Sequence, residues 1–211
     1  AVYFVGDGGY IYKSTNILTG VTVLSAAGQT TQNLTRIHGA AGTIVAVGAG
    51  NVILVSTNRG VTWSVPAAGV TGAHSAVSVL GPLDWYVGTL DTTGKVWYTG
   101  TAGAIWTQLV LPGAALTTVN DIVWATNEDG WIAATRSGPT AAIFQTTYGG
   151  AIWGESNTSR LPPTLPVFAR ANRIAVPTVP DLMVDANNIA LAGLGGGFTD
   201  GVIYVGVAPV L

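Results

Sequence analysis

One short pattern recurs along the 211 residues of the chain, and this repetition restricts the possible folds more than any other feature. Runs of apolar residues that end in Gly or Ala return at intervals of roughly 40 to 60 residues, the period of repeat architectures. These runs occupy residues 3–6, 45–48, 85–88, 131–134 and 190–193. A chain built from such units is expected to stack copies of one supersecondary element.

Each apolar run is followed, after a turn rich in Gly, Asp, Asn or Ser, by a second β-rich run. These second runs occupy residues 11–14, 53–56, 96–99, 143–146 and 203–206. Two such runs joined by a turn predict a β-hairpin. A further strand is expected ahead of the apolar run at residues 34–38, 76–80, 121–125 and 173–176. Helices are disfavoured because Gly and Pro interrupt the chain throughout.

A third element follows the second run, in residues 56–63, 99–106 and 146–153. Each copy has Ser or Thr, then Gly four residues later, then Trp three residues beyond. Ser14 and Gly20 belong to a fourth, longer copy that lacks the Trp. Ser, Thr and Asn suit a tight turn, Gly supplies a positive φ, and the Trp starts the next strand and packs beneath the turn.

This third element resembles the Asp-box, or BNR repeat, with the pattern Ser-x-Asp-x-Gly-x-x-Trp. That repeat occurs in sialidases, in photosystem II assembly-factor propellers and in many bacterial and phage surface proteins. The Asp position is occupied here by Asn58, Thr101 and Tyr148, so the motif is degenerate. The resemblance implies a β-propeller and gives a structural role to Ser14, Gly20, Ser56, Gly60, Trp63, Thr99, Gly103, Trp106, Thr146, Gly150 and Trp153.

Four strands per repeat is the size of a propeller blade. We therefore expect an all-β fold, a single domain over residues 1–211 that forms a β-propeller of about five four-stranded blades, with incomplete first and last blades. The predicted repeat units cover residues 1–32, 33–72, 73–117, 118–160 and 161–211. Two alternatives remain open: an open arc belonging to a longer protein, and a ring completed by a neighbouring chain.

Charge is unusually scarce, since 9% of residues are Asp, Glu, Lys or Arg where about 25% is typical. The net charge of −2 argues against a nucleic-acid-binding face, which needs clustered cations. The absence of cysteine excludes disulfide scaffolds and zinc ribbons. The uncharged run at residues 39–55 predicts two buried strands and a turn rather than a membrane insertion. No signal peptide is visible at the start.

Polar residues on or near the innermost strands are candidates for lining a central channel. They are Arg36, His38, His74, Asp121 and Arg173. No Glu or Cys completes a metal-ligand set with them, so we expect hydrogen-bonded channel residues, with no metal, no cofactor and no catalytic group. A glycosidase needs two carboxylates about 5 to 10 Å apart, and Glu128, Asp129 and Glu155 are expected away from the usual active-site mouth.

A ligand-binding face is expected where the loops that join the first and second runs gather. Its candidate residues are Asp7, Asn51, Asp91, Arg136 and Asp200. Trp97 and Trp124 are candidates for stacking on a sugar ring, the signature of a lectin.

These observations favour a non-enzymatic structural or adhesive propeller, a component of a phage virion or tail. The expected partners are other virion or assembly proteins, the chain itself, and a surface glycan, with no nucleic acid and no membrane insertion. The expected location is a virion or the extracellular surface of a cell. A carbohydrate-binding lectin and a sialidase-like glycoside hydrolase are the alternatives.

Overall fold

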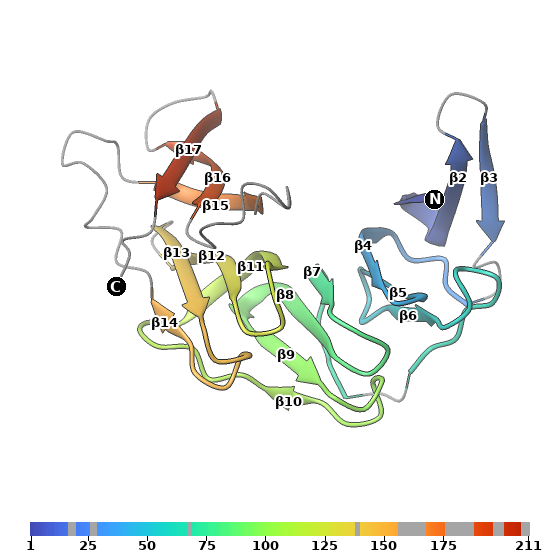
Figure 1. Cartoon of the computed structure of the whole chain (residues 1–211), viewed down its shortest axis with the longest axis horizontal. Coiled ribbons are helices and arrows are strands. Elements are labelled where there is room, and N and C mark those ends of the chain that lie inside the picture. Colours follow the sequence, from blue (N-terminus) through green and yellow to red (C-terminus); the bar gives the residue numbers. More distant parts are fainter. Residues whose placement is uncertain are drawn as a thin grey trace. The chain divides into compact units, whose positions relative to one another are not determined.

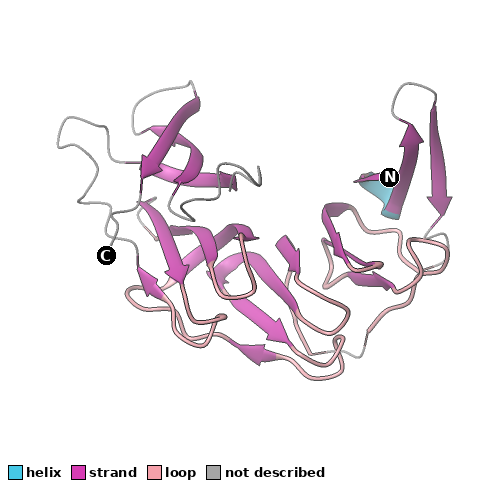
Figure 2. Ribbon diagram, viewed as in Figure 1, coloured by secondary structure: helices cyan, strands magenta, loops and turns pink. Residues whose placement is uncertain are grey.

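The computed structural model describes residues 1–16, 20–25, 29–66, 69–137, 140–155, 168–175, 188–195 and 201–207. Within these ranges the chain is all-β, and its one helical element is the short 3-10 turn η1, Asp7–Gly9 (Figure 2). None of the described segments is a helix with the length and apolarity needed to cross a membrane. Two compact units are present, residues 1–91 with 96–109 and residues 92–95 with 110–211.

The first unit holds three groups of antiparallel strands, each made of strands adjacent in sequence (Figure 1). The first group is β1 (Val2–Val5), β2 (Tyr10–Asn16) and β3 (Gly20–Ser25). The second is β4 (Leu34–Ala40), β5 (Thr43–Gly48) and β6 (Ile53–Ser56). The third is β7 (His74–Val79), β8 (Trp85–Gly94), β9 (Val96–Thr99) and β10 (Thr107–Gln108), paired in that order.

The second unit repeats the arrangement. One group comprises β11 (Leu116–Trp124), β12 (Gly130–Arg136), β13 (Thr140–Thr146) and β14 (Gly154–Glu155). The other comprises β15 (Phe168–Ala175), β16 (Asn188–Gly195) and β17 (Gly201–Val207). The leading strands β4, β7, β11 and β15 all carry β-bulges where they pair with the next strand.

The strands follow the sequence pattern closely, with two departures. In the β4–β6 group a fourth strand is reduced to one bridge between Val55 and Ser64. The first group lacks a leading strand and the last group lacks a trailing one among the described residues.

The core lies between neighbouring sheets, and β5 shows why long uncharged runs occur in this chain. Its Val45 and Val47 pack into a cluster with Val77, Trp85 and other residues of the third group. Its Ile44 and Ala46 point to the other face, where they pack with Ile11 of the first group. Because alternate residues of a strand face opposite sides, a strand covered on both sides must be apolar throughout. The uncharged run at residues 39–55 therefore lies inside the protein.

Candidate functional site

Three turns of one construction link successive strands in the two units; we call residues 56–63, 99–106 and 146–153 the Ser/Thr–Gly–Trp turns. In each, the first hydroxyl accepts the N–H of the glycine four residues later. The distances are 2.8 Å from Gly60 N to Ser56 Oγ, 3.0 Å from Gly103 N to Thr99 Oγ1 and 3.2 Å from Gly150 N to Thr146 Oγ1. The same oxygens accept a second N–H two residues along.

Each turn needs two successive residues with positive φ, and the second is always the motif glycine. The pairs are Arg59–Gly60, Ala102–Gly103 and Gly149–Gly150. The first member of each pair also donates its N–H to the preceding hairpin turn, to the carbonyls of Gly42, Leu83 and Glu128 respectively. Each motif turn is therefore hydrogen-bonded to the hairpin turn at the same end of its own group of strands.

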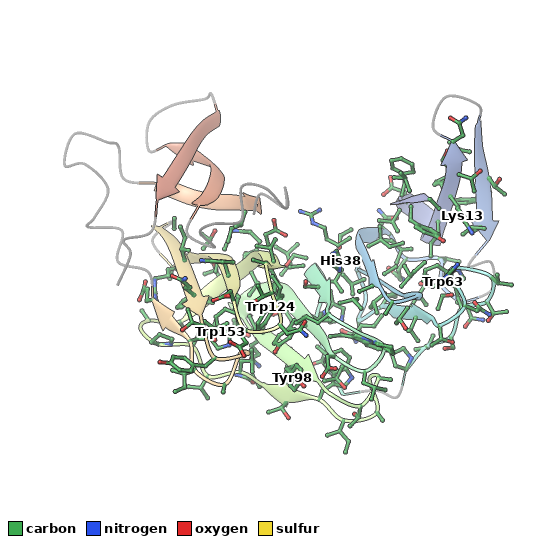
Figure 3. The ribbon with its side chains drawn as sticks, viewed as in Figure 1. Lys13, His38, Trp63, Tyr98, Trp124 and Trp153 are labelled. Carbon is green, nitrogen blue, oxygen red and sulfur yellow. The ribbon has the colours of Figure 1, made fainter. Side chains whose placement is uncertain are left out.

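Trp63 and Trp153, which end two of these turns and are labelled in Figure 3, are buried. Trp106 lies against Trp85 with ring centroids 6.4 Å apart, and Trp153 meets Trp124 edge to face at 5.7 Å. Ser14 and Gly20 form a different contact, because the Ser14 hydroxyl donates to the Gly20 carbonyl at 2.9 Å. The first repeat thus does not reproduce the turn of the others.

The tips of the three turns carry large apolar side chains that remain in solvent. Val61, Ile105 and Ile152 are 76%, 66% and 65% exposed. Tyr148 is 68% exposed, and Leu83, whose carbonyl receives the Ala102 N–H, is also exposed. Sequence reasoning assigned no function to these positions, although Ile105 and Ile152 directly precede a motif Trp and Val61 lies two residues before one.

Two of the channel candidates join the leading strands of neighbouring sheets. The Nδ1 atom of His38 on β4 accepts the N–H of Val79 on β7 at 2.9 Å. The Oδ2 atom of Asp121 on β11 accepts the N–H of Ile174 on β15 at 3.1 Å, and its Oδ1 accepts the N–H of Ile122. Both side chains bind main-chain groups of a strand that does not pair with their own.

The other channel candidates are placed as follows. Arg36 lies on β4 and donates to the carbonyl of Thr35. His74 is fully buried at the start of β7, and its carbonyl accepts the Thr35 hydroxyl at 2.7 Å. Arg173 lies on β15, and the structure does not describe its side chain. Thr35, which sequence reasoning passed over, thus forms a further link between β4 and β7.

The candidate loop residues do not share one environment. Asp7 is exposed in η1, whereas Asn51 has positive φ and accepts the N–H of Gly72 at 2.5 Å. Arg136 pairs with Glu155 at 2.6 Å, donates to the carbonyl of Ala114 and lies 5.7 Å from the ring centroid of Phe144. Asp91 belongs to β8, but its side chain is not described, and Asp200 lies outside the described residues.

The remaining polar and aromatic candidates are also engaged in packing. Trp97 packs against the core cluster of the second and third groups, and Trp124 contacts Trp153. In the part of the chain that the structure describes, no three His, Asp or Glu residues gather as a metal site would require.

Tyr98 donates its hydroxyl to Asp84 Oδ1 at 2.8 Å. Burial is the main cause that raises the pKa of Tyr98, and this hydrogen bond raises it further.

No family model matches the sequence, and no curated protein matches it. Solved structures do match. YCF48 from Cyanidioschyzon merolae superposes with a TM-score of 0.66 at 13% identity, over 98% of this chain and 66% of that one. A GH74 enzyme from Niastella koreensis gives 0.70 at 16% identity, over 93% and 32%. The GH74 xyloglucanase from Xanthomonas campestris gives 0.50 at 14% identity, over 90% and 28%.

The chain therefore spans about two thirds of YCF48 and about a third of the GH74 enzymes. At these identities the likeness concerns architecture, and one fold hosts unrelated functions. The antiparallel groups of sequence-adjacent strands, the near absence of helix and these structural neighbours together show that the chain has a β-propeller fold.

Proposed function

We propose that this propeller is a non-enzymatic binding module, a structural or adhesive part of a larger protein assembly. The observation that carries the proposal is the exposure of Val61, Ile105 and Ile152 at the tips of equivalent turns. Ile105 and Ile152 occupy the same position, directly before the motif Trp, and Val61 lies one residue earlier in its turn. Large exposed apolar side chains of this kind are candidates for contact with a partner. A chain with so few charges also gains from covering such residues.

The structural contacts of the acidic residues support a non-enzymatic role. Asp121 accepts two main-chain N–H groups and Glu155 is paired with Arg136. Asp129 accepts the hydroxyl of Thr126 at 2.9 Å. A glycosidase needs one carboxyl group that gives up a proton and a second that attacks or activates water. Carboxylates held in structural contacts are poorly suited to either task.

Three narrower proposals follow from the sequence resemblance. The Ser/Thr–Gly–Trp turns are degenerate Asp-box repeats, and the strands make up five blades, of which the first and last are incomplete. The assembly is a phage virion or tail, or otherwise an extracellular surface. Co-purification of the chain with particles, or its absence from them, tests the last of these proposals.

The binding role is tested by replacing the turn tips. Ile105→Ser and Ile152→Ser, alone and combined, are expected to weaken association about tenfold or more in sedimentation velocity over a wide concentration range. Val110→Ser is the matched control, because Val110 is 91% exposed and lies outside these turns. Thermal melting of each variant verifies that the fold is intact. A chain that is monomeric at every concentration and absent from any particle would contradict the proposal.

Enzymatic and lectin functions give different results. Turnover of chromogenic glycosides that is lost in Asp121→Asn or Glu155→Gln, with melting unchanged, would establish a hydrolase and overturn the proposal. Binding on a glycan array that is insensitive to the turn-tip variants would favour a lectin instead.

A further inference from the structure

The first unit contains a cavity of about 690 Å³ between the β1–β3 and β4–β6 groups. Residues of β1 and β2, the hairpin turn between β4 and β5, and Arg59 line it. This volume is within the range of about 300 to 1,000 Å³ typical of ligand sites. None of the interactions described so far accounts for a hollow at this place.

The charges around the cavity are all of one sign. Lys13 and Arg59 line it, and no Asp or Glu does. Neither cation forms an ion pair with a residue that the structure describes. In a chain with eight Lys and Arg and ten Asp and Glu, two adjacent cations without a carboxylate form a local positive field.

Contacts hold the Lys13 side chain and the backbone of Arg59 in place. The hydroxyl of Tyr3 and the Nζ of Lys13 both donate to the Arg59 carbonyl, at 2.8 and 3.3 Å. Lys13, labelled in Figure 3, also lies 5.5 Å from the centroid of the Tyr3 ring. Arg59 has a left-handed backbone with φ of 58°, and its side chain runs past Gly42 in the β4–β5 turn. A cation held in this way, as Lys13 is, loses little freedom when an anion binds.

A sheet edge adjoins the same cavity. The strand β1 pairs with β2 alone in the described chain, whereas its counterparts β5, β8, β12 and β16 pair on both sides. Ala1 and Val2, at the start of β1, line the cavity. An unpaired edge is a template for an incoming strand, and peptides bind in this way by β-augmentation.

We propose that this cavity and edge bind an extended acidic peptide segment of a partner, with carboxylate side chains against Lys13 and Arg59 and its backbone paired with β1. This inference rests on the proposed binding role and names the chemistry of one partner. The occupant is a polypeptide because the edge offers main-chain hydrogen bonds, and it is acidic because both fixed charges are positive.

The test uses fluorescence polarisation with the whole chain and a labelled hexapeptide of alternating valine and aspartate. An asparagine twin removes the charge, and a twin N-methylated on its backbone removes strand pairing. We expect the acidic peptide to bind at least about tenfold more tightly than either twin, and more weakly as salt rises. Equal binding of the acidic peptide and either twin would overturn the proposal.

Variants of the chain locate the site. Lys13→Gln and Arg59→Asn should each weaken binding about three- to tenfold, and asparagine at position 59 tolerates the left-handed backbone. Lys95→Gln removes the same charge outside the cavity lining and should leave affinity within about twofold. Thermal melting checks the fold. An equal loss in Lys95→Gln would show a general charge effect and refute the site.

One further outcome separates this inference from the proposed function. If the sugar acid N-acetylneuraminic acid binds while no peptide does, the cavity is a glycan site and the peptide proposal fails. Failure of every probe also refutes it, but loss of association in Ile105→Ser and Ile152→Ser would still support a binding module.

Discussion

The turns at residues 56–63 and 146–153 share their first hydroxyl, their glycine and their tryptophan, and differ at the middle position. Asn58 accepts the Thr62 N–H at 2.9 Å and the Ser56 hydroxyl at 3.0 Å, so it closes the first turn from within. Tyr148 has no such role and turns outward into solvent. The hydroxyl–glycine distance is 2.8 Å in the first turn and 3.2 Å in the second.

The turn at residues 99–106 shows that a threonine hydroxyl can replace the asparagine amide at the middle position. Thr101 Oγ1 accepts the N–H of Ile105 at 2.8 Å, which is the contact that Asn58 makes in its own turn. Hydroxyl, glycine and tryptophan are thus enough to build the fold of the turn, and the middle residue adds stability. The predictions below test this division, beginning with the part common to all copies.

Removing the tryptophan should have the largest effect, and an equal one in both turns. Trp63→Ala and Trp153→Ala are each expected to lower the free energy of unfolding by about 3–5 kcal/mol, because both side chains are buried. Urea denaturation followed by circular dichroism measures this. Trp63→Phe is the control and should cost much less, since the Trp63 indole nitrogen is buried without a hydrogen bond. A small loss of unfolding free energy in Trp153→Ala, beside a large one in Trp63→Ala, would show that the two tryptophans do not contribute equally.

Substitutions of the glycines should show that the second residue with positive φ in a turn is less tolerant of a side chain than the first. A Cβ at Gly60, where φ is 82°, would lie 2.8 Å from Leu24 Cδ1, so Gly60→Ala combines backbone strain with overpacking and should cost about 2–4 kcal/mol. At Gly149, with φ of 61°, the nearest atom is 3.4 Å away. Gly149→Ala should therefore cost only about 1 kcal/mol. Denaturant midpoints compare them, and equal losses would contradict this reading.

The first hydroxyl should matter more where its hydrogen bond from the motif glycine is shorter. Ser56→Ala leaves the Gly60 N–H buried without an acceptor and should cost about 1–3 kcal/mol. Thr146→Val keeps the shape of the side chain and removes a longer bond to Gly150, so its cost is expected at the lower end of that range. Amide hydrogen exchange at Gly60 and Gly150 measures the local effect. Faster exchange at Gly150 than at Gly60 in the variants would reverse the order.

Local pattern predicted the strands and these turns well, because both depend on residues close in sequence. The recurring apolar run at residues 45–48 lies within β5, as predicted. The strand expected at residues 76–80 starts instead at His74, since a polar residue that is buried leaves no apolar signal. The strand expected to start at Trp63 is reduced to a single bridge at Ser64.

The contacts between sheets could not be predicted from the sequence. His38 meets Val79, and Asp121 meets Ile174, 53 residues further along the chain. Such pairings depend on the packing of neighbouring sheets, which no local period encodes. Arg136, a candidate for the ligand-binding face, pairs with Glu155, which the sequence did not indicate. The cavity at Lys13 and Arg59 joins residues from two repeats, so neither repeat alone indicates it.

The smallest effect should come from the middle position, and it should be a gain. Tyr148 is 68% exposed, so Tyr148→Asn removes little packing. It introduces the kind of side-chain amide with which Asn58 closes its own turn. We expect the free energy of unfolding to rise by about 0.5–1.5 kcal/mol, the net value of a hydrogen bond. Asn58→Ala is the reciprocal change and should lower it by a similar amount. If Asn58→Ala costs energy while Tyr148→Asn gains none, then the two turns differ in backbone geometry, and the middle residue cannot be exchanged between them.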